Sequence, residues 1–251
     1  MVKLIINADD FGYSNGVNLG IIEAFQKGIV TSATLMANMP GAAHAAALAA
    51  QNPGLGVGIH LVLDCGYPVN SSVHSLVDDT GKFHKTDVVL SGGDIKDIEK
   101  ELTSQIERFL SFGLVPTHID SHHHVHGHER VFPIVKDLAI KYDIPIRPAS
   151  EELLKAEDSL KSVDYFNPEF YGESLSNQTI IDVINKCKDY ETAEIMTHPA
   201  YLDEAILSGS SYALPRVREL SILTAQEVRD FISEQGIELA TYKQIAGQSY
   251  V

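Results

Sequence analysis

Six of the 11 histidines in this chain fall within the eleven residues from His118 to His128. His118, Asp120 and His122 are two residues apart, so an extended strand would point all three side chains to one face. Imidazoles beside a carboxylate are ligands that zinc and other divalent cations take in proteins. The pattern therefore indicates a metal site, although a solvated histidine-rich loop or a structural hydrogen-bond cluster would also produce it.

Two adjacent carboxylates, Asp9 and Asp10, follow the apolar residues Leu4, Ile5 and Ile6. Such a pair can simply start a turn or cap a helix. At the rim of a core, however, two like charges repel each other unless a cation lies between them. We therefore expect one Asp to bind a metal ion and the other to remain free as a base.

Further polar side chains stand at or near the carboxyl ends of other expected strands: Asn38, His60, Arg147 and His198. In parallel α/β folds these ends meet on one face, where ligands bind. Arg147 has apolar neighbours, so we expect a specific partner for it, including a buried ion pair with one of the Asp residues. His198 is either a functional group or a satisfied core histidine.

One Asp and two His on a divalent cation leave open positions for water and substrate. Such an ion lowers the pKa of water toward ~7 and polarises a carbonyl group, while a free carboxylate accepts the proton of the water. This is hydrolytic chemistry. The chain has no Gly-x-Ser-x-Gly or His-Glu-x-x-His motif, which argues against serine and thermolysin-like hydrolases. Neither Cys has activating neighbours in the sequence, which argues against a cysteine hydrolase.

These residues need a scaffold of alternating strands and helices. The expected strands cover residues 3–7, 31–37, 56–63, 115–120, 143–147, 163–166, 193–197 and 238–242. Apolar residues with helical spacing follow Asp94, Gly127 and residue 179, and an alanine-rich helix covers residues 42–50. Asp94 is expected to cap its helix, and Thr224 with Glu227 is expected to form a capping box for a last helix that ends at Gly236.

About eight strand–helix units in about 250 residues predict an α/β fold, a distorted (β/α) TIM-like barrel with seven or eight parallel strands. An open doubly wound sheet is the alternative, but no Gly-x-Gly-x-x-Gly follows the first strand. We expect one catalytic domain over residues 1–251. Residues 64–93 and 202–222 are predicted to be long loops, either of which can form a lid.

Composition narrows the functional classes. The chain has 251 residues, 19 basic and 34 acidic side chains and a net charge of −15, which disfavours nucleic acids and anionic membranes as partners. Two distant cysteines, Cys65 and Cys187, are expected to be reduced thiols, and the first residues lack a signal peptide. Together these features predict a cytoplasmic protein.

Three segments resemble the signature motifs of the YdjC-type carbohydrate deacetylases, a family that includes chitooligosaccharide (diacetylchitobiose) deacetylases. They are Asn7-Ala8-Asp9-Asp10-Phe11-Gly12, Gly58-Ile59-His60-Leu61 and the histidine-rich run from Thr117 to His126. Residues 196–200 and 212–219 also look like later segments of the family. The resemblance implies a distorted barrel, often a homodimer, that removes an acetyl group from an N-acetylglucosamine unit of a short oligosaccharide.

The resemblance also implies roles for individual residues. Asp10, His60 and His122 would be the metal ligands, and His118 could replace one of them. Asp9 would be the general base and His198 the general acid, with Arg147 holding and tuning Asp9. The family implies Mg²⁺, whereas two imidazoles favour Zn²⁺ or another transition metal.

The chain has no Trp, so stacking on a sugar would use Phe11, Tyr171 or Tyr201. Two other functions remain open at this point. One is a metal-dependent phosphoesterase, which usually carries two metal ions. The other is a sugar- or metal-binding protein without catalysis.

Overall fold

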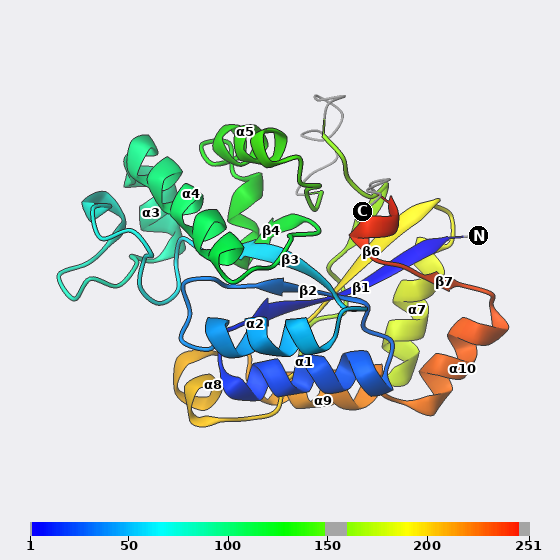
Figure 1. Ribbon diagram of the computed structural model, residues 1–251. Coiled ribbons are helices and arrows are strands. Elements are labelled where there is room, and N and C mark those ends of the chain that lie inside the picture. The colour runs from blue at the N-terminus through cyan, green and yellow to red at the C-terminus, as the bar shows by residue number, and fades with distance from the viewer. Residues whose placement is uncertain (1, 149–159, 246–251) are drawn as a thin grey trace.

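The computed structural model describes residues 2–148 and 160–245, where strands and helices alternate (Figure 1). The strands are β1 (Lys3–Phe11), β2 (Ser32–Leu35), β3 (Gly56–Leu61), β4 (Ile119–Ser121), β5 (Tyr165–Asn167), β6 (Thr192–Thr197) and β7 (Glu238–Leu239). The α-helices are α1 (Asn15–Lys27), α2 (Ala42–Gln51), α3 (Thr86–Gly92), α4 (Ile95–Ser111), α5 (Phe132–Tyr142), α7 (Asn177–Cys187), α8 (Glu204–Gly209), α9 (Leu214–Leu223), α10 (Gln226–Glu234) and α11 (Tyr242–Ile245). Two 3₁₀-helices, η1 (His74–Leu76) and η2 (His122–Gly127), complete these elements.

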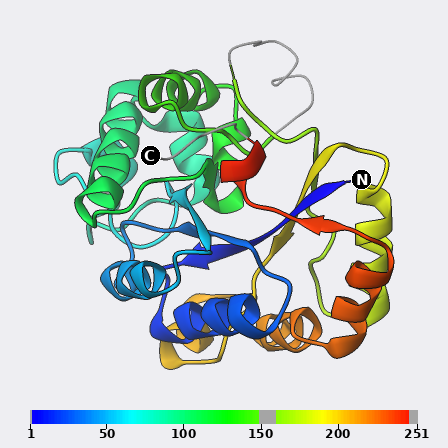
Figure 2. The ribbon, with the colours of Figure 1, turned by 45° about the vertical axis from the view of Figure 1, so that its right-hand side comes forward.

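All strand pairs are parallel, in the order β4-β3-β2-β1-β6-β5, and β7 pairs with the beginning of β1. The sheet curls without closing, and helices surround its outer side (Figure 2). This curled half-barrel confirms the prediction of a distorted (β/α) barrel. The carboxyl ends of its strands come together at one rim.

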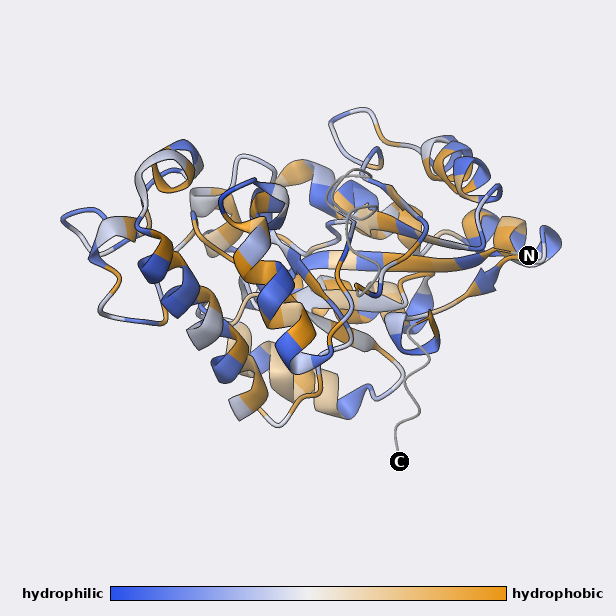
Figure 3. Cartoon of the chain, turned by 90° about the horizontal axis from the view of Figure 1, so that it is seen from above, coloured by the Kyte–Doolittle hydropathy of each residue, from blue (hydrophilic) through white to orange (hydrophobic). Residues whose placement is uncertain are grey.

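The helices bury one apolar side and expose a polar side, as the alternating colours along them show (Figure 3). In α4 the buried stripe consists of Ile98, Leu102, Ile106 and Phe109, at helical spacing. Asp94 caps this helix by accepting a hydrogen bond from the Lys96 backbone N–H, as predicted. In the described parts of the chain, no helix is long and apolar enough to cross a membrane.

Several of the expected strands were wrong in extent. The first strand continues to Phe11 instead of ending at residue 7, and the strand expected at 115–120 begins only at Ile119. Residues 143–147 form only a single parallel bridge, Ile119 to Ile146, because Pro145 has no N–H to continue a ladder. The last expected strand stops at Leu239, and Tyr242 already begins α11. The segment 143–147 nevertheless hydrogen-bonds to β4, since the Arg147 N–H donates to the Ile119 carbonyl over 2.8 Å.

The capping box predicted at Thr224 is also wrong. Thr224 Oγ1 donates to the Leu220 carbonyl at the end of α9, and Glu227 accepts a hydrogen bond from Asn177 instead. Gly236 does follow α10, with a positive φ of 63°. The two predicted long loops contain short helices: η1 and α3 lie in 64–93, while α8 and most of α9 lie in 202–222.

A close contact between β3 and β4 fixes the strand that carries His60. A Cβ added at Gly58 would lie 2.4 Å from the His118 ring and 2.7 Å from the His118 carbonyl oxygen. Only a glycine therefore fits at this point of the second motif.

We expect Gly58→Ala to lower the free energy of unfolding by about 1–3 kcal/mol, because overpacking displaces backbone as well as a side chain. Urea denaturation measures this. Gly92→Ala is the control, since nothing lies within 4 Å of a Cβ there. An unchanged midpoint for Gly58→Ala would show that β3 and β4 separate without cost.

Candidate functional site

The two carboxylates of β1 lie side by side at the rim because the strand is irregular there. The register with β2 shifts between Ala8 and Phe11, and Asp10 has a φ of 67°. Neighbouring residues of a regular strand point to opposite faces, whereas a bulge re-aims one of them. Asp9 and Asp10 are both buried and both line the same cavity.

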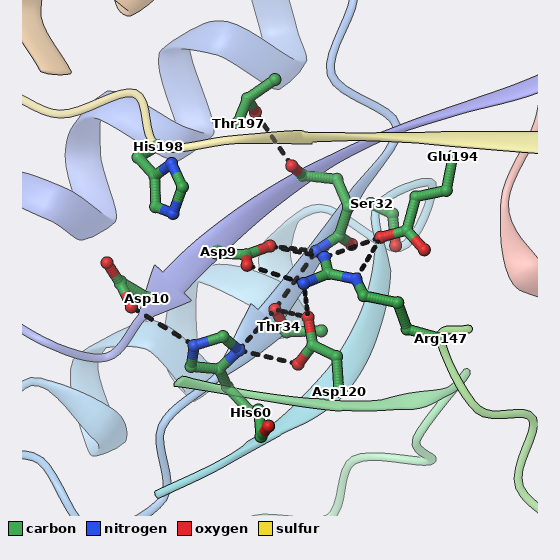
Figure 4. A network of polar contacts seen from close by, with 12 residues as sticks. Asp9, Asp10, Ser32, Thr34, His60, Asp120, Arg147, Glu194, Thr197 and His198 are labelled. Carbon is green, nitrogen blue, oxygen red and sulfur yellow. Dashed lines mark hydrogen bonds and ion pairs between the residues drawn. The ribbon is translucent and has the colours of Figure 1, made fainter. Parts of the chain in front are cut away.

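Below Asp9 lies a fully buried guanidinium, that of Arg147 (Figure 4). Its Nη1 and Nη2 donate to the two oxygens of Asp9 over 2.8 and 2.6 Å. Nη1 also lies 2.8 Å from Asp120 Oδ2, and Nε donates to Glu194 Oε1 over 2.8 Å. One cation thus pairs with three buried carboxylates that come from β1, β4 and β6.

This network keeps Asp9 ionised. Burial alone would raise the pKa of Asp9, but Arg147 outweighs burial and holds that pKa below its usual value. The pKa of Asp120 is lowered in the same way, with Arg147 and His60 outweighing burial. Arg147 is therefore both the anchor of Asp9 and the reason that it carries a negative charge.

Asp10, His60 and His122 meet at the mouth of the cavity. Asp10 Oδ1 is buried and lies 3.3 Å from His60 Nε2 and 3.2 Å from His122 Nδ1, and apart from these two ion-pair contacts it has no hydrogen bond among the described residues. The second nitrogen of His60, Nδ1, lies 2.7 Å from Asp120 Oδ1. That contact orients the ring so that Nε2 faces Asp10, the arrangement that supports a histidine ligand.

The donor set fits a divalent cation. One carboxylate oxygen and two imidazole nitrogens lie within 4.8 Å of one another. Although burial lowers the pKa of His60, Asp120 and Asp10 raise it to about 10. His60 is therefore protonated at pH 7 in the metal-free protein, and a cation that binds there would have to displace this proton.

The structure does not bring His118 to this group. His118 faces the interior with Asp120, as the two-residue spacing predicts, but it lies deeper and does not line the cavity. Its ring stacks on Tyr242 at 4.0 Å, and burial lowers its pKa to about 3. Asn38 is also outside the cavity: its amide holds the carbonyls of Cys65 and Tyr67.

His198 follows β6 and lines the same cavity from the opposite side. Its backbone N–H donates to Glu219, whose other oxygen accepts a 2.6 Å hydrogen bond from Tyr212. His198 Nδ1 is buried 3.9 Å from Glu219 Oε1 and has no hydrogen-bond partner among the described residues, and burial lowers the pKa of His198 to about 4. The ring is therefore neutral at pH 7 in the substrate-free protein.

The cavity has a volume of about 490 Å³. Tyr171 lines it, is 51% exposed and stacks on Tyr212 at 4.0 Å. The other two aromatic candidates do not reach the cavity, because Phe11 is fully buried and Tyr201 bonds to Glu23 on the surface. Of the three aromatic candidates, Tyr171 is the one that lines this cavity, together with Tyr13 and Tyr212.

Sequence reasoning missed Arg216 and Glu219, both on α9. Arg216 Nη2 donates to Asp10 Oδ2 over 2.6 Å and outweighs the effect of burial, so the pKa of Asp10 lies well below its usual value. The two residues are three apart and share the buried face of the helix. The available signal in the sequence was the helical spacing of Arg216 and Glu219 with Leu220 and Leu223, which indicates that they share the buried face of one helix.

Replacing Arg147 by Met would leave three buried carboxylates without their cation. We expect the free energy of unfolding at pH 7 to fall by about 3–5 kcal/mol, the usual result of removing one partner of a buried ion pair. In the wild type the lowered pKa values make stability fall as the solution is acidified through them. In Arg147→Met the pKa values of the carboxylates rise above their unfolded values, so stability increases toward pH 5.

Urea denaturation at pH 7 and pH 5 tests this. Arg130→Met is the matched control, because among the described residues the guanidinium of Arg130 bonds the backbone carbonyls of Leu90 and Gly93 and no carboxylate. Between these two pH values the lowered pKa values leave the wild type unchanged, because the unfolded carboxylates titrate only near pH 4. A variant of Arg147 that gains no stability at pH 5 would contradict the proposed pairing.

The chain is similar to known proteins over nearly its whole length. A family model described as YdjC-like protein matches residues 3–234. A carbohydrate deacetylase of Geobacillus stearothermophilus is 54% identical over 240 residues, covering 96% of each chain. A carbohydrate deacetylase of Brevibacillus brevis is 50% identical, covering 97% of this chain and all of the relative.

A solved structure from Enterococcus faecalis V583 superposes with a TM-score of 0.93 at 37% identity. The match covers 97% of this chain and 98% of the other. That protein is described in terms of cellobiose-phosphate cleavage.

Proposed function

The chain belongs to the YdjC-like protein family, and on this basis we propose that it is a metal-dependent carbohydrate deacetylase. The proposed reaction removes the N-acetyl group from N-acetylglucosamine units of short chitooligosaccharides such as diacetylchitobiose or its 6-phosphate. The observation that carries the proposal is the buried Asp10 Oδ1, which faces the nitrogens of His60 and His122 at 3.3 and 3.2 Å beside the ionised Asp9. The two curated relatives are named carbohydrate deacetylases, which supports the reaction class.

Asp10, His60 and His122 would hold one divalent cation. When bound, such an ion polarises the acetyl carbonyl and lowers the pKa of water. Mg²⁺ is the ion implied by the family resemblance, and the two imidazoles also suit Zn²⁺ or another transition metal.

Asp9 is the proposed general base. It accepts a proton from the water whose oxygen forms a bond to the acetyl carbon, and the carbon–nitrogen bond then breaks to give acetate and a free amine. Arg147 binds both oxygens of Asp9 and fixes the direction in which the carboxylate faces. We assign Arg147 a positioning role, because it lies below Asp9 rather than at the cavity surface.

His198 is the proposed general acid for the departing amine. Because its pKa is about 4 in the free protein, the ring must take up a proton during the reaction. Negative charge that develops on the acetyl group beside it raises that pKa. The buried Nδ1 without a partner is a nitrogen available for this step.

The cavity suits a short sugar. About 490 Å³ falls within the range of small-molecule sites, and Tyr171 offers an exposed aromatic face for one sugar ring. We propose that Tyr171 takes the stacking role that a tryptophan often fills.

Acetate release from diacetylchitobiose tests the proposed function. We expect release with an added divalent cation and loss of at least about 100-fold in rate after chelation or in Asp9→Asn, since general-base catalysis contributes about 10²–10⁴-fold. Asp182→Asn is the matched control, because Asp182 lies exposed on α7. No acetate with Mg²⁺, Zn²⁺, Co²⁺ or Mn²⁺ would refute deacetylation of this substrate.

The metal ligands have a separate test. We expect His122→Ala to weaken cation binding by more than about 100-fold, beyond the 10–100-fold loss typical of groups that only support a ligand. Equilibrium dialysis with elemental analysis measures it, with His74→Ala on the surface as the control. Full metal content in His122→Ala would refute the ligand set, and two ions per wild-type chain would favour a phosphoesterase.

We also propose that the protein acts in the cytoplasm as a homodimer. Cys65 and Cys187 are free thiols in the structure, which suits a reducing compartment, and the net charge of −15 disfavours nucleic acids and anionic membranes as partners. The dimer rests on the family resemblance alone. A monomer mass in sedimentation equilibrium would contradict it.

A further inference from the structure

The guanidinium of Arg216 has hydrogen-bonding capacity that the proposed mechanism does not use. Arg216 is 4% exposed; its Nη2 donates to Asp10, and its Nε donates to the Tyr212 carbonyl over 2.7 Å. Its Nη1 is buried and has no hydrogen-bond partner among the described residues. A buried donor without a partner destabilises the folded protein, so a group of this kind indicates that an acceptor binds there.

The position of Arg216 identifies where that acceptor lies. Arg216 lines the same cavity as Asp9 and His198. It holds one oxygen of Asp10, while the other oxygen of Asp10 faces His60 and His122. An acetyl group that reacts beside these three residues therefore lies next to the free Nη1.

The chemistry of the group selects an oxygen that carries negative charge. Arg has donors only and keeps its charge, and its two N–H groups on Nη1 suit a carbonyl or carboxylate oxygen. Glu219, a possible local acceptor, does not satisfy Nη1: it bonds Tyr212 and His198, and burial raises its pKa to about 8.

We propose that Arg216 is a catalytic residue whose Nη1 donates to the acetyl oxygen, stabilising the negative charge that develops there and binding the acetate product. This inference rests on the proposed deacetylation. It adds a donor from the protein itself, in the manner of an oxyanion hole. The competing explanation is that Arg216 only compensates the charge of Asp10.

Arg216→Lys separates the two explanations, because a lysine keeps the positive charge beside Asp10 but has no second terminal nitrogen to replace Nη1. At saturating cation we expect kcat to fall by about 100-fold, the usual effect of losing one oxyanion donor, with KM within about 3-fold. We expect calorimetry to show acetate binding at least about 10-fold weaker, since a charge-assisted hydrogen bond is lost, and cation binding within about 3-fold of the wild type.

Arg218→Lys is the matched control, since Arg218 lies on the same helix, bonds the Leu175 carbonyl and does not line the cavity. If Arg216→Lys weakens only cation binding, and kcat and acetate affinity return at saturating cation, Arg216 is a counter-ion and the inference is wrong. Should Arg216→Lys fail to fold, Arg216→Gln takes its place. Because Gln retains a donor for Asp10 but loses the charge, kcat and acetate affinity are then compared only at saturating cation, where a mere counter-ion role predicts wild-type values.

The acetate titration also separates this inference from the proposed function. If the wild type releases no acetate from the sugar, deacetylation of that substrate fails, but the titration still decides the role of Arg216. Acetate binding that Arg216→Lys weakens supports an oxyanion site. Equal binding in both proteins, or none in the wild type, overturns it.

Discussion

The pairing of one buried guanidinium with three buried carboxylates determines how the site is built. Arg147 draws Asp9, Asp120 and Glu194 together from three strands, and Asp120 in turn orients His60. Burying a charge is costly unless partners and hydrogen bonds compensate for it. Carboxylates still outnumber guanidiniums once Asp10 and Arg216 are included. A divalent cation would offset this excess, so the same charges that stabilise the fold also favour metal binding.

The fold was predictable where one pattern dominated. The apolar stripe of α4 and the capping residue Asp94 predicted that helix, and the alternation of strands with helices predicted the parallel sheet. Prediction failed where tertiary contacts decide the local structure. Residues 143–147 are apolar enough for a strand, but Pro145 interrupts the ladder. Thr224 has the right neighbours for a capping box, yet its hydroxyl bonds the preceding helix.

For the site, strand ends were the most informative signal, since Asp9, Asp10, His60 and His198 meet in one cavity as expected. Spacing alone could not say how deep each side chain lies. The two-residue period correctly placed His118 on the interior side, but below the cavity. The helical spacing of Arg216 with Leu220 and Leu223 indicated a buried position but not its role, because its partner Asp10 is 206 residues away.

That separation in the sequence has a kinetic consequence. The contacts that complete the site join residue 9 to 147 and residue 10 to 216. The first strand must therefore be in contact with segments from the middle and the last part of the chain before the site is complete. Contacts between distant residues form late and slow folding, because the loop they close must first lose its entropy. During synthesis, the histidine-rich segment therefore leaves the ribosome well before the pocket can form. We therefore expect the site to assemble only after most of the barrel has folded.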